Sequence, residues 1–191
     1  LLGGFSVLTC LFLLYLRLSR YRIGFVDMRI KRYATYAALG IVVLVGQIAL
    51  GGWTSANYAA LACTEFPVCE GDWLNRIDMA GAYSVPEAAN YEYGAHDYAE
   101  RMTMHIVHRL GAVITFLYLG WLAISLYRRS ASQHLRNASV VLALVLLAQV
   151  GLGISNVVFS LPLQVAVLHN AVAACLLLVL VLITYTLYRK V

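Results

Sequence analysis

Charged residues are scarce in this sequence. Asp, Glu, Lys and Arg make up 12% of its 191 residues, whereas hydrophobic residues make up 62%. A soluble domain is about 25% charged and a disordered chain has few apolar residues, so both classes are excluded. Cysteine is also rare, with four residues, which excludes a disulfide-rich mini-protein. Mean hydropathy is +0.78, and we conclude that lipid solvates part of the fold.

The basic and acidic residues lie in different parts of the chain. Eight of the nine acidic residues fall between Glu65 and Glu100. The basic residues gather beside apolar runs, as Arg17, Arg20, Arg22, Arg29, Lys31 and Arg32, as Arg128, Arg129 and Arg136, and as Arg189 and Lys190. Basic loops stay on the inner side of a membrane. The net charge of +5 therefore indicates topology, and nucleic acid is not expected as a partner.

Long apolar runs predict an all-α integral membrane protein. A helix of about 20 residues crosses a bilayer, and a helix satisfies its own backbone there. The five runs are 1–16, 33–53, 102–127, 138–158 and 163–188. The first is short and has no starting Met, so we interpret residues 1–32 as the end of a preceding transmembrane helix and a basic inner loop. Residues 33–191 are predicted to form a four-helix transmembrane bundle.

The acidic segment at about 62–101 is predicted to be a loop on the outer side of the membrane. A connection of this length usually has structure of its own or a function. Ser84 and Pro86 suggest a helix start, so we expect a short surface helix there. Cys63 and Cys69 lie in the same loop. An oxidising exterior favours a disulfide between them, with two free thiols or a redox-active bridge as alternatives.

The four complete runs repeat one pattern twice. Residues 47–51 read QIALG and residues 149–153 read QVGLG, and the helix after each carries a histidine near its outer end, His108 or His169. The large loop interrupts only the first copy. Two repeated helix pairs have a pseudo-twofold axis, so the two histidines are predicted to face each other across it.

These paired histidines suggest a metal centre. Each lies six residues into its predicted span, about 9 Å from the outer helix end. Two histidines on facing helices at one depth can supply both axial ligands of a haem iron. The alternative is a pair of interhelical hydrogen bonds. Zinc is less favoured, because it takes four ligands and no thiolate or carboxylate is expected nearby. His96 and His134 are predicted to lie in solvated loops.

Four further polar side chains in the spans are candidate cofactor-binding residues. Arg109 follows His108 and could pair with a haem propionate or reach the outer surface. His105 lies one turn before His108 and could bind a ligand or contact water. Gln47 and Gln149 could contact the cofactor or hold helices together.

Several of these motifs together resemble the haem A synthase family. They are LGGWTSANYAALAC at 50–63 with Phe66, Pro67 and Cys69 following, MHIVHRLGA at 104–112, LGISN at 152–156 and LPLQVAVLHN at 161–170. The family has eight transmembrane helices in two similar halves. This chain resembles the C-terminal half, preceded by part of the fourth helix. The N-terminal half of the family has Glu where this chain has His105.

The resemblance implies an oxidoreductase of haem A biosynthesis and cytochrome oxidase assembly, which oxidises a methyl of haem O to the formyl of haem A. It implies that His108 and His169 ligate the iron of a haem b, and that Cys63 and Cys69 match the family's outer-loop cysteine pair. The catalytic residues are expected in the N-terminal half, so activity is expected of the complete protein.

Substrate, partners and location follow from the same resemblance. Haem O is the expected substrate, and haem O synthase, an electron donor and further copies of the chain are candidate partners. The expected location is the bacterial plasma membrane or the mitochondrial inner membrane. The main alternative is a membrane cytochrome b-type electron-transfer subunit without its own catalysis. A structural or assembly module without haem is a second alternative.

Overall fold

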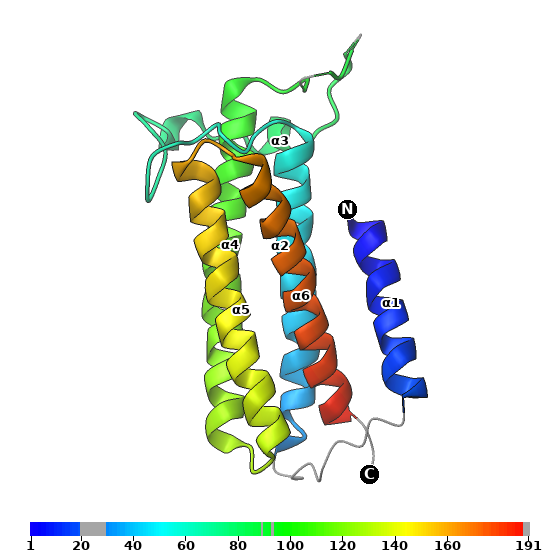
Figure 1. Ribbon diagram of the computed structural model, residues 1–191. Coiled ribbons are helices and arrows are strands. Elements are labelled where there is room, and N and C mark those ends of the chain that lie inside the picture. The colour runs from blue at the N-terminus through cyan, green and yellow to red at the C-terminus, as the bar shows by residue number, and fades with distance from the viewer. Residues whose placement is uncertain (20–29, 89, 93, 189–191) are drawn as a thin grey trace.

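The computed structural model describes residues 1–19, 30–88, 90–92 and 94–188 (Figure 1). Every regular element in these ranges is helical, which confirms the predicted fold class. The elements are α1 (Leu2–Leu18), α2 (Tyr33–Ala56), the 3-10 turn η2 (Leu74–Arg76), α3 (Met79–Ala82), α4 (Tyr98–Arg129), α5 (Gln133–Val158) and α6 (Leu163–Tyr188). Four of them, α2, α4, α5 and α6, are long and apolar enough to cross a membrane.

The four long helices form a closed bundle in which each packs against two neighbours. Helix α2 packs against α4 and α6, and α5 packs against the same two helices (Figure 1). Consequently α4 and α6 lie at opposite corners of the bundle, as do α2 and α5. The two predicted helix pairs, α2 with α4 and α5 with α6, are both neighbouring pairs in this arrangement.

The bundle is apolar both inside and outside. Leucines from all four helices fill the centre, where Leu44, Leu119, Leu142 and Leu180 are each no more than 3% exposed. The outer face is equally apolar, and Val42, Leu117 and Leu144 are more than 60% exposed. Exposed leucine and valine in such numbers are stable only against hydrocarbon. The chain is therefore a multi-pass membrane protein.

Helix α1 lies beside α6 and α2, at the edge of the bundle (Figure 1). Phe5, Phe12 and Leu13 pack against the main core, and the Tyr185 hydroxyl donates to the Leu16 carbonyl at 3.2 Å. Of the basic residues that predict the inner side, Arg20, Arg22, Arg29, Arg189 and Lys190 lie outside the described residues.

Helix α4 begins one turn earlier than the hydropathy predicts. Its N-cap is Asp97, whose side chain accepts from the Glu100 amide, while the Glu100 carboxylate accepts from the Asp97 amide. This capping box starts the helix at Tyr98, before the apolar run begins at Met102. The prediction of equal depth for the two histidines counted residues from Met102. Because α4 begins at Tyr98, His108 lies about one turn further from its helix start than His169 does.

The predicted helix start at Ser84 is wrong. Ser84 follows α3, and both its amide and its hydroxyl donate to the Gly81 carbonyl. Ser84 therefore caps the end of a preceding turn, and residues 85–88 are not helical. The N-cap in this region is Asp78, whose carboxylate accepts from the Gly81 amide at 2.9 Å. Asp and Ser are both good N-caps, and the sequence pattern alone favoured the wrong one.

Candidate functional site

The two predicted ligands lie on the diagonal of the bundle. His108 is on α4 and His169 is on α6, the two helices that occupy opposite corners. Both side chains are partly buried. This is the arrangement that a pseudo-twofold axis between the two helix pairs predicts.

His108 is held by α2, the first helix of its own pair. The Gln47 side-chain nitrogen Nε2 lies 3.0 Å from Nδ1 of the His108 ring, and it also donates to the His108 carbonyl at 3.0 Å. One turn further along α2, Gly51 faces the edge of the ring. A Cβ at Gly51 would lie 2.8 Å from the His108 Cε1, which is too close. The ring is therefore fixed between an amide and a glycine.

His169 is held in the same way by α5. The Gln149 Nε2 lies 3.3 Å from Nδ1 and 3.2 Å from Nε2 of the His169 ring. Gly153, one turn later, faces the ring edge, and a Cβ there would lie 3.2 Å from Cε1. We call each Gln and Gly, four residues apart, an imidazole seat. The structure places Gly51 and Gly153 against the histidine rings.

The two seats differ in the space around the glutamine. In the first pair, the Gln47 Oε1 occupies the position where a Cβ of Gly111 would be. Gly111 lies three residues after His108, and the residue three after His169 is Val172. The second pair therefore has a β-branched residue where the first has a glycine. We attribute the longer Gln149 contacts to this difference.

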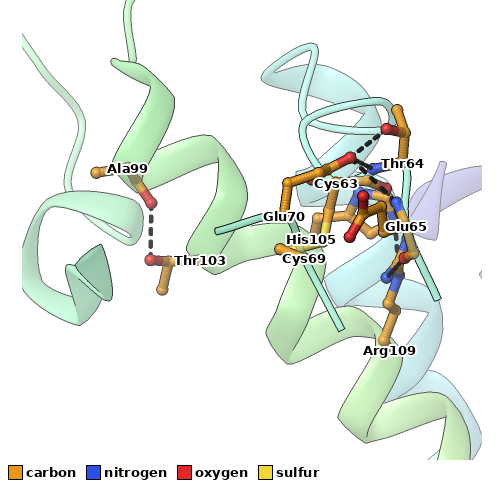
Figure 2. Close-up of a disulfide and its surroundings, with 9 residues drawn as sticks. All are labelled: Cys63, Thr64, Glu65, Cys69, Glu70, Ala99, Thr103, His105 and Arg109. Atoms are coloured by element: carbon orange, nitrogen blue, oxygen red, sulfur yellow. Dashed lines mark hydrogen bonds between the residues drawn. A yellow bond between two sulfur atoms is a disulfide. The ribbon is translucent and has the colours of Figure 1, made fainter. Parts of the chain in front are cut away.

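Arg109 connects α4 to the outer loop. Its Nη2 donates to the Cys63 carbonyl at 2.6 Å and its Nη1 to the Glu65 carbonyl at 2.7 Å (Figure 2). Its Nε donates to Nε2 of His105 at 3.2 Å, and its guanidinium stacks over the Phe66 ring. Arg109 therefore does not extend freely into solvent.

His105 is buried and belongs to the same contact. It is 4% exposed, and its Nε2 accepts from Arg109. The Ala59 carbonyl also lies near its ring. This position excludes the alternative in which His105 contacts bulk water. His105 orients Arg109 toward the loop instead.

The segment that Arg109 binds is closed by the Cys63–Cys69 disulfide (Figure 2). The Glu70 carboxylate accepts from the Thr64 hydroxyl, from the Thr64 amide at 2.9 Å and from the Glu65 amide at 3.1 Å. These donors, the Thr64 hydroxyl first, lower the pKa of Glu70 from 4.5 to about 2. Because the disulfide uses both sulfurs, the cluster of Cys63, Cys69 and Glu70 does not offer thiolates to a metal.

The rest of the loop packs on the C-terminal end of α2 and the N-terminal end of α4. The Trp53 indole nitrogen donates to the Ala82 carbonyl at 2.9 Å, and the Asp78 amide donates to the Thr103 hydroxyl at 3.0 Å. His96 was predicted to be solvated, but it is 7% exposed. It pairs with the Glu100 carboxylate at 2.9 Å because the capping box brings Glu100 within one turn of it. His134 is exposed, at the start of α5.

The donor set suits a haem better than other metals. Two imidazoles on opposite helices can bind the two axial positions of a haem iron. Structural zinc takes four ligands, and no third ligand among the described residues is grouped with these histidines. Two cavities of about 420 and 430 Å³ lie elsewhere, at the C-terminal end of α4 and between α1 and α2. The fit of a haem therefore rests on the donors and their diagonal placement.

Comparison with known proteins places the chain in a family. The family model COX15-CtaA, described as cytochrome oxidase assembly protein, matches residues 1–181. This chain belongs to that family. The heme A synthase of Shewanella oneidensis is 50% identical over all of this chain and 57% of its own length. No solved structure matches the chain.

Relatives of lower identity carry the same name. The heme A synthase of Mesorhizobium japonicum is 30% identical over 75% of this chain, and that of Chelativorans sp. is 29% identical over 77%. The chain spans 57% of the length of the Shewanella oneidensis relative, 38% of the Mesorhizobium japonicum one and 37% of the Chelativorans sp. one.

Proposed function

We propose that this chain is the C-terminal, haem b-binding half of a haem A synthase, an oxidoreductase that converts a methyl of haem O to the formyl of haem A. The observation that carries the proposal is the pair of imidazole seats on the bundle diagonal. Its support from relatives is the 50% identity to a heme A synthase over the whole chain. The catalytic residues are proposed to lie outside these 191 residues.

In this proposal, His108 and His169 are the axial ligands of the haem iron. A haem held by two histidines has no open iron position, and it supplies electron transfer when bound. The residues of this chain bind and orient it. The seats hold both rings, and the apolar bundle around them excludes water. Substrate oxidation is assigned to the other half of the protein.

Arg109 is proposed to bind a haem propionate in addition to the outer loop. Its Nη1 and Nη2 each donate one N–H to a loop carbonyl. Each of these nitrogens has a second N–H, so the guanidinium can bind a carboxylate while it holds the loop. His105 supports this role by accepting from Nε. Both residues act at the boundary between bundle and loop.

We further propose that the 62–101 loop lies on the outer side of a bacterial plasma membrane or a mitochondrial inner membrane. The support is the acidic loop at one end of the bundle and the arginines at the other. Haem O is the proposed substrate, with haem O synthase and an electron donor as proposed partners. A cysteine introduced at the exposed Val85 should react with an impermeant maleimide in intact cells, and one introduced at Ala131 should not.

A spectrum tests the ligand assignment. The protein purified from membranes should show a low-spin b-type signal in a reduced-minus-oxidised spectrum. His108→Ala and His169→Ala should each abolish it, whereas His134→Ala, an exposed histidine at the inner end, should leave it unchanged. If both ligand variants keep the wild-type spectrum, the assignment of the two histidines is wrong.

An activity assay separates the enzyme from the electron carrier. The complete protein is supplied with haem O, oxygen and reductant, and the products are followed by mass spectrometry. Hydroxylated or formylated haem supports the proposed function. An intact b-type spectrum with no product under any reducing system would instead support an electron-transfer subunit.

A further inference from the structure

Each predicted haem ligand has a glutamine side chain within hydrogen-bond distance of its ring. Gln47 contacts the His108 ring from α2, and Gln149 contacts the His169 ring from α5. The same contact occurs twice, on two different pairs of helices. A glutamine that served only to join two helices could bond any acceptor on the neighbouring helix. Here both of them lie against an imidazole nitrogen.

The amide oxygens of these glutamines are buried without a partner. Oε1 of Gln47 and Oε1 of Gln149 each lie out of contact with solvent and accept no hydrogen bond. Leaving a buried acceptor unpaired is costly, and such an atom calls for an explanation. Two equivalent glutamines with the same unpaired atom point to a common use.

We propose that Gln47 and Gln149 are positioning residues that hold the imidazole of each axial histidine, Gln47 at Nδ1 of His108 and Gln149 beside both ring nitrogens of His169, and so set the ring orientation and the electron donation to the haem. The inference rests on the proposed function, because it takes His108 and His169 to be the ligands. It adds a role for two residues that contact the histidine rings.

The protonation of imidazole explains why an amide suits this role. A neutral histidine that ligates through Nε2 has its proton on Nδ1, where it needs an acceptor. A half-turn of the glutamine amide would bring Oε1 to that nitrogen, and at Gln47 it would also end the donation from Nε2 to the His108 carbonyl. Gly111 leaves room for the Gln47 amide, because Oε1 lies close to where a Cβ of residue 111 would be. One side chain can therefore donate to a ring nitrogen in the free chain and accept from it in the loaded chain.

The contacts also predict that the two glutamines differ in strength. Gln47 Nε2 reaches both the His108 ring and the His108 carbonyl at 3.0 Å. Gln149 Nε2 lies at 3.2 and 3.3 Å from the two ring nitrogens and, among the described residues, donates to no backbone carbonyl. We therefore expect substitution of Gln47 to change the haem more than substitution of Gln149.

Two substitutions of similar size at each glutamine test the role, because they should shift the reduction potential of the haem in opposite directions. Gln→Met keeps the size and removes the acceptor, so the ligand becomes a weaker donor and the reduction potential should shift to more positive values. Gln→Glu keeps an acceptor and strengthens it, so the potential should shift to more negative values. The variants are Gln47→Met, Gln47→Glu, Gln149→Met and Gln149→Glu, and the control is Ser139→Ala, a buried hydroxyl on α5 that bonds only its own helix.

The measurements are a redox titration of the b-type signal and the electron paramagnetic resonance g values, which depend on the ring planes. Opposite shifts for Met and Glu, larger at residue 47, support the proposal. Shifts of the same sign, or no shifts, overturn the proposed role of the glutamines. If the wild-type protein still shows the b-type signal, the proposed function is unaffected by that result. A wild-type protein without that signal overturns the proposed function itself.

A haem-free measurement covers variants that do not load haem. Nitrogen NMR of the histidine rings in detergent reports which ring nitrogen carries the proton. Gln47→Met should change the tautomer population of His108 and leave that of His134 unchanged. If the His108 ring is the same in wild type and Gln47→Met, the glutamine does not control it and the proposal fails.

Discussion

The two helix pairs use one seat in two settings. In α2 and α4, Gly51 lies tightly against the His108 ring and Gln47 makes two contacts with His108. Arg109, the residue after His108, binds the disulfide loop. In α5 and α6, a short turn replaces the loop, and Asn170 follows the histidine. The comparison shows that the repeated seat does not need the loop, which adds rigidity to one side only.

The largest expected effect on the haem signal concerns the glycines of the two seats. Gly51→Ala should push the His108 ring aside and cost about 1–3 kcal/mol by overpacking, with loss of most of the b-type signal. Gly153→Ala should cost less than about 1 kcal/mol, because its Cβ has 3.2 Å to the nearest ring atom. Thermal unfolding and the haem spectrum measure both.

Gly46→Ala is the matched control for these variants. Gly46 is on α2 and has nothing within 4 Å of an added Cβ. Alanine there should stabilise the helix by about 0.5–1 kcal/mol. Equal effects of Gly51→Ala and Gly153→Ala would show that the two seats are packed alike.

The second expected effect concerns the residue that follows each histidine. Arg109→Met removes charge-assisted bonds to the Cys63 and Glu65 carbonyls, and should open the loop by about 1.5–3 kcal/mol in hydrogen exchange of residues 63–70. Asn170 is exposed and holds the equivalent position after His169, so Asn170→Met should leave the hydrogen exchange of residues 63–70 unchanged. Similar exchange in both variants would mean that the disulfide alone orders the loop.

A smaller effect is expected at Gly111. An added Cβ meets Oε1 of Gln47, the end of a flexible side chain, so Gly111→Ala should cost about 1–2 kcal/mol and lengthen the Gln47–His108 contact. Gly120→Ala on the same helix meets nothing within 4 Å and is the control. If Gly111→Ala leaves the electron paramagnetic resonance g values unchanged, Val172 is not the reason for the weaker second seat.

The smallest effect is a pH dependence confined to the looped pair. The folded pKa of Glu70, about 2, lies below its ordinary value of 4.5, so its contribution to loop stability is complete above about pH 4.5 and is lost as pH falls toward 2. Exchange of the Thr64 and Glu65 amides should therefore rise, relative to its intrinsic pH dependence, in acid. Glu70→Gln should remove this pH dependence, with a cost below about 1 kcal/mol at neutral pH. The turn between α5 and α6 should show no such change.

Hydropathy and the repeat were sufficient to predict the bundle. Four runs of apolar residues require four spanning helices, and the paired QIALG and QVGLG motifs identify which helices correspond. The disulfide partners followed from two cysteines in one loop. Helix starts were less accurate, because Asp97 and Glu100 extend α4 beyond its apolar run, and because Asp78, not Ser84, caps the helix in the loop.

By itself the sequence determined that the chain spans a membrane and that His108 and His169 are equivalent, since length, hydropathy and motif order are local properties. Only the tertiary structure decided that Gly51 and Gly153 face the imidazoles, that Arg109 binds the disulfide loop, and that His96 is buried. Such contacts join residues far apart in the chain. They depend on which helix packs beside which, and the composition of one helix does not specify its neighbour.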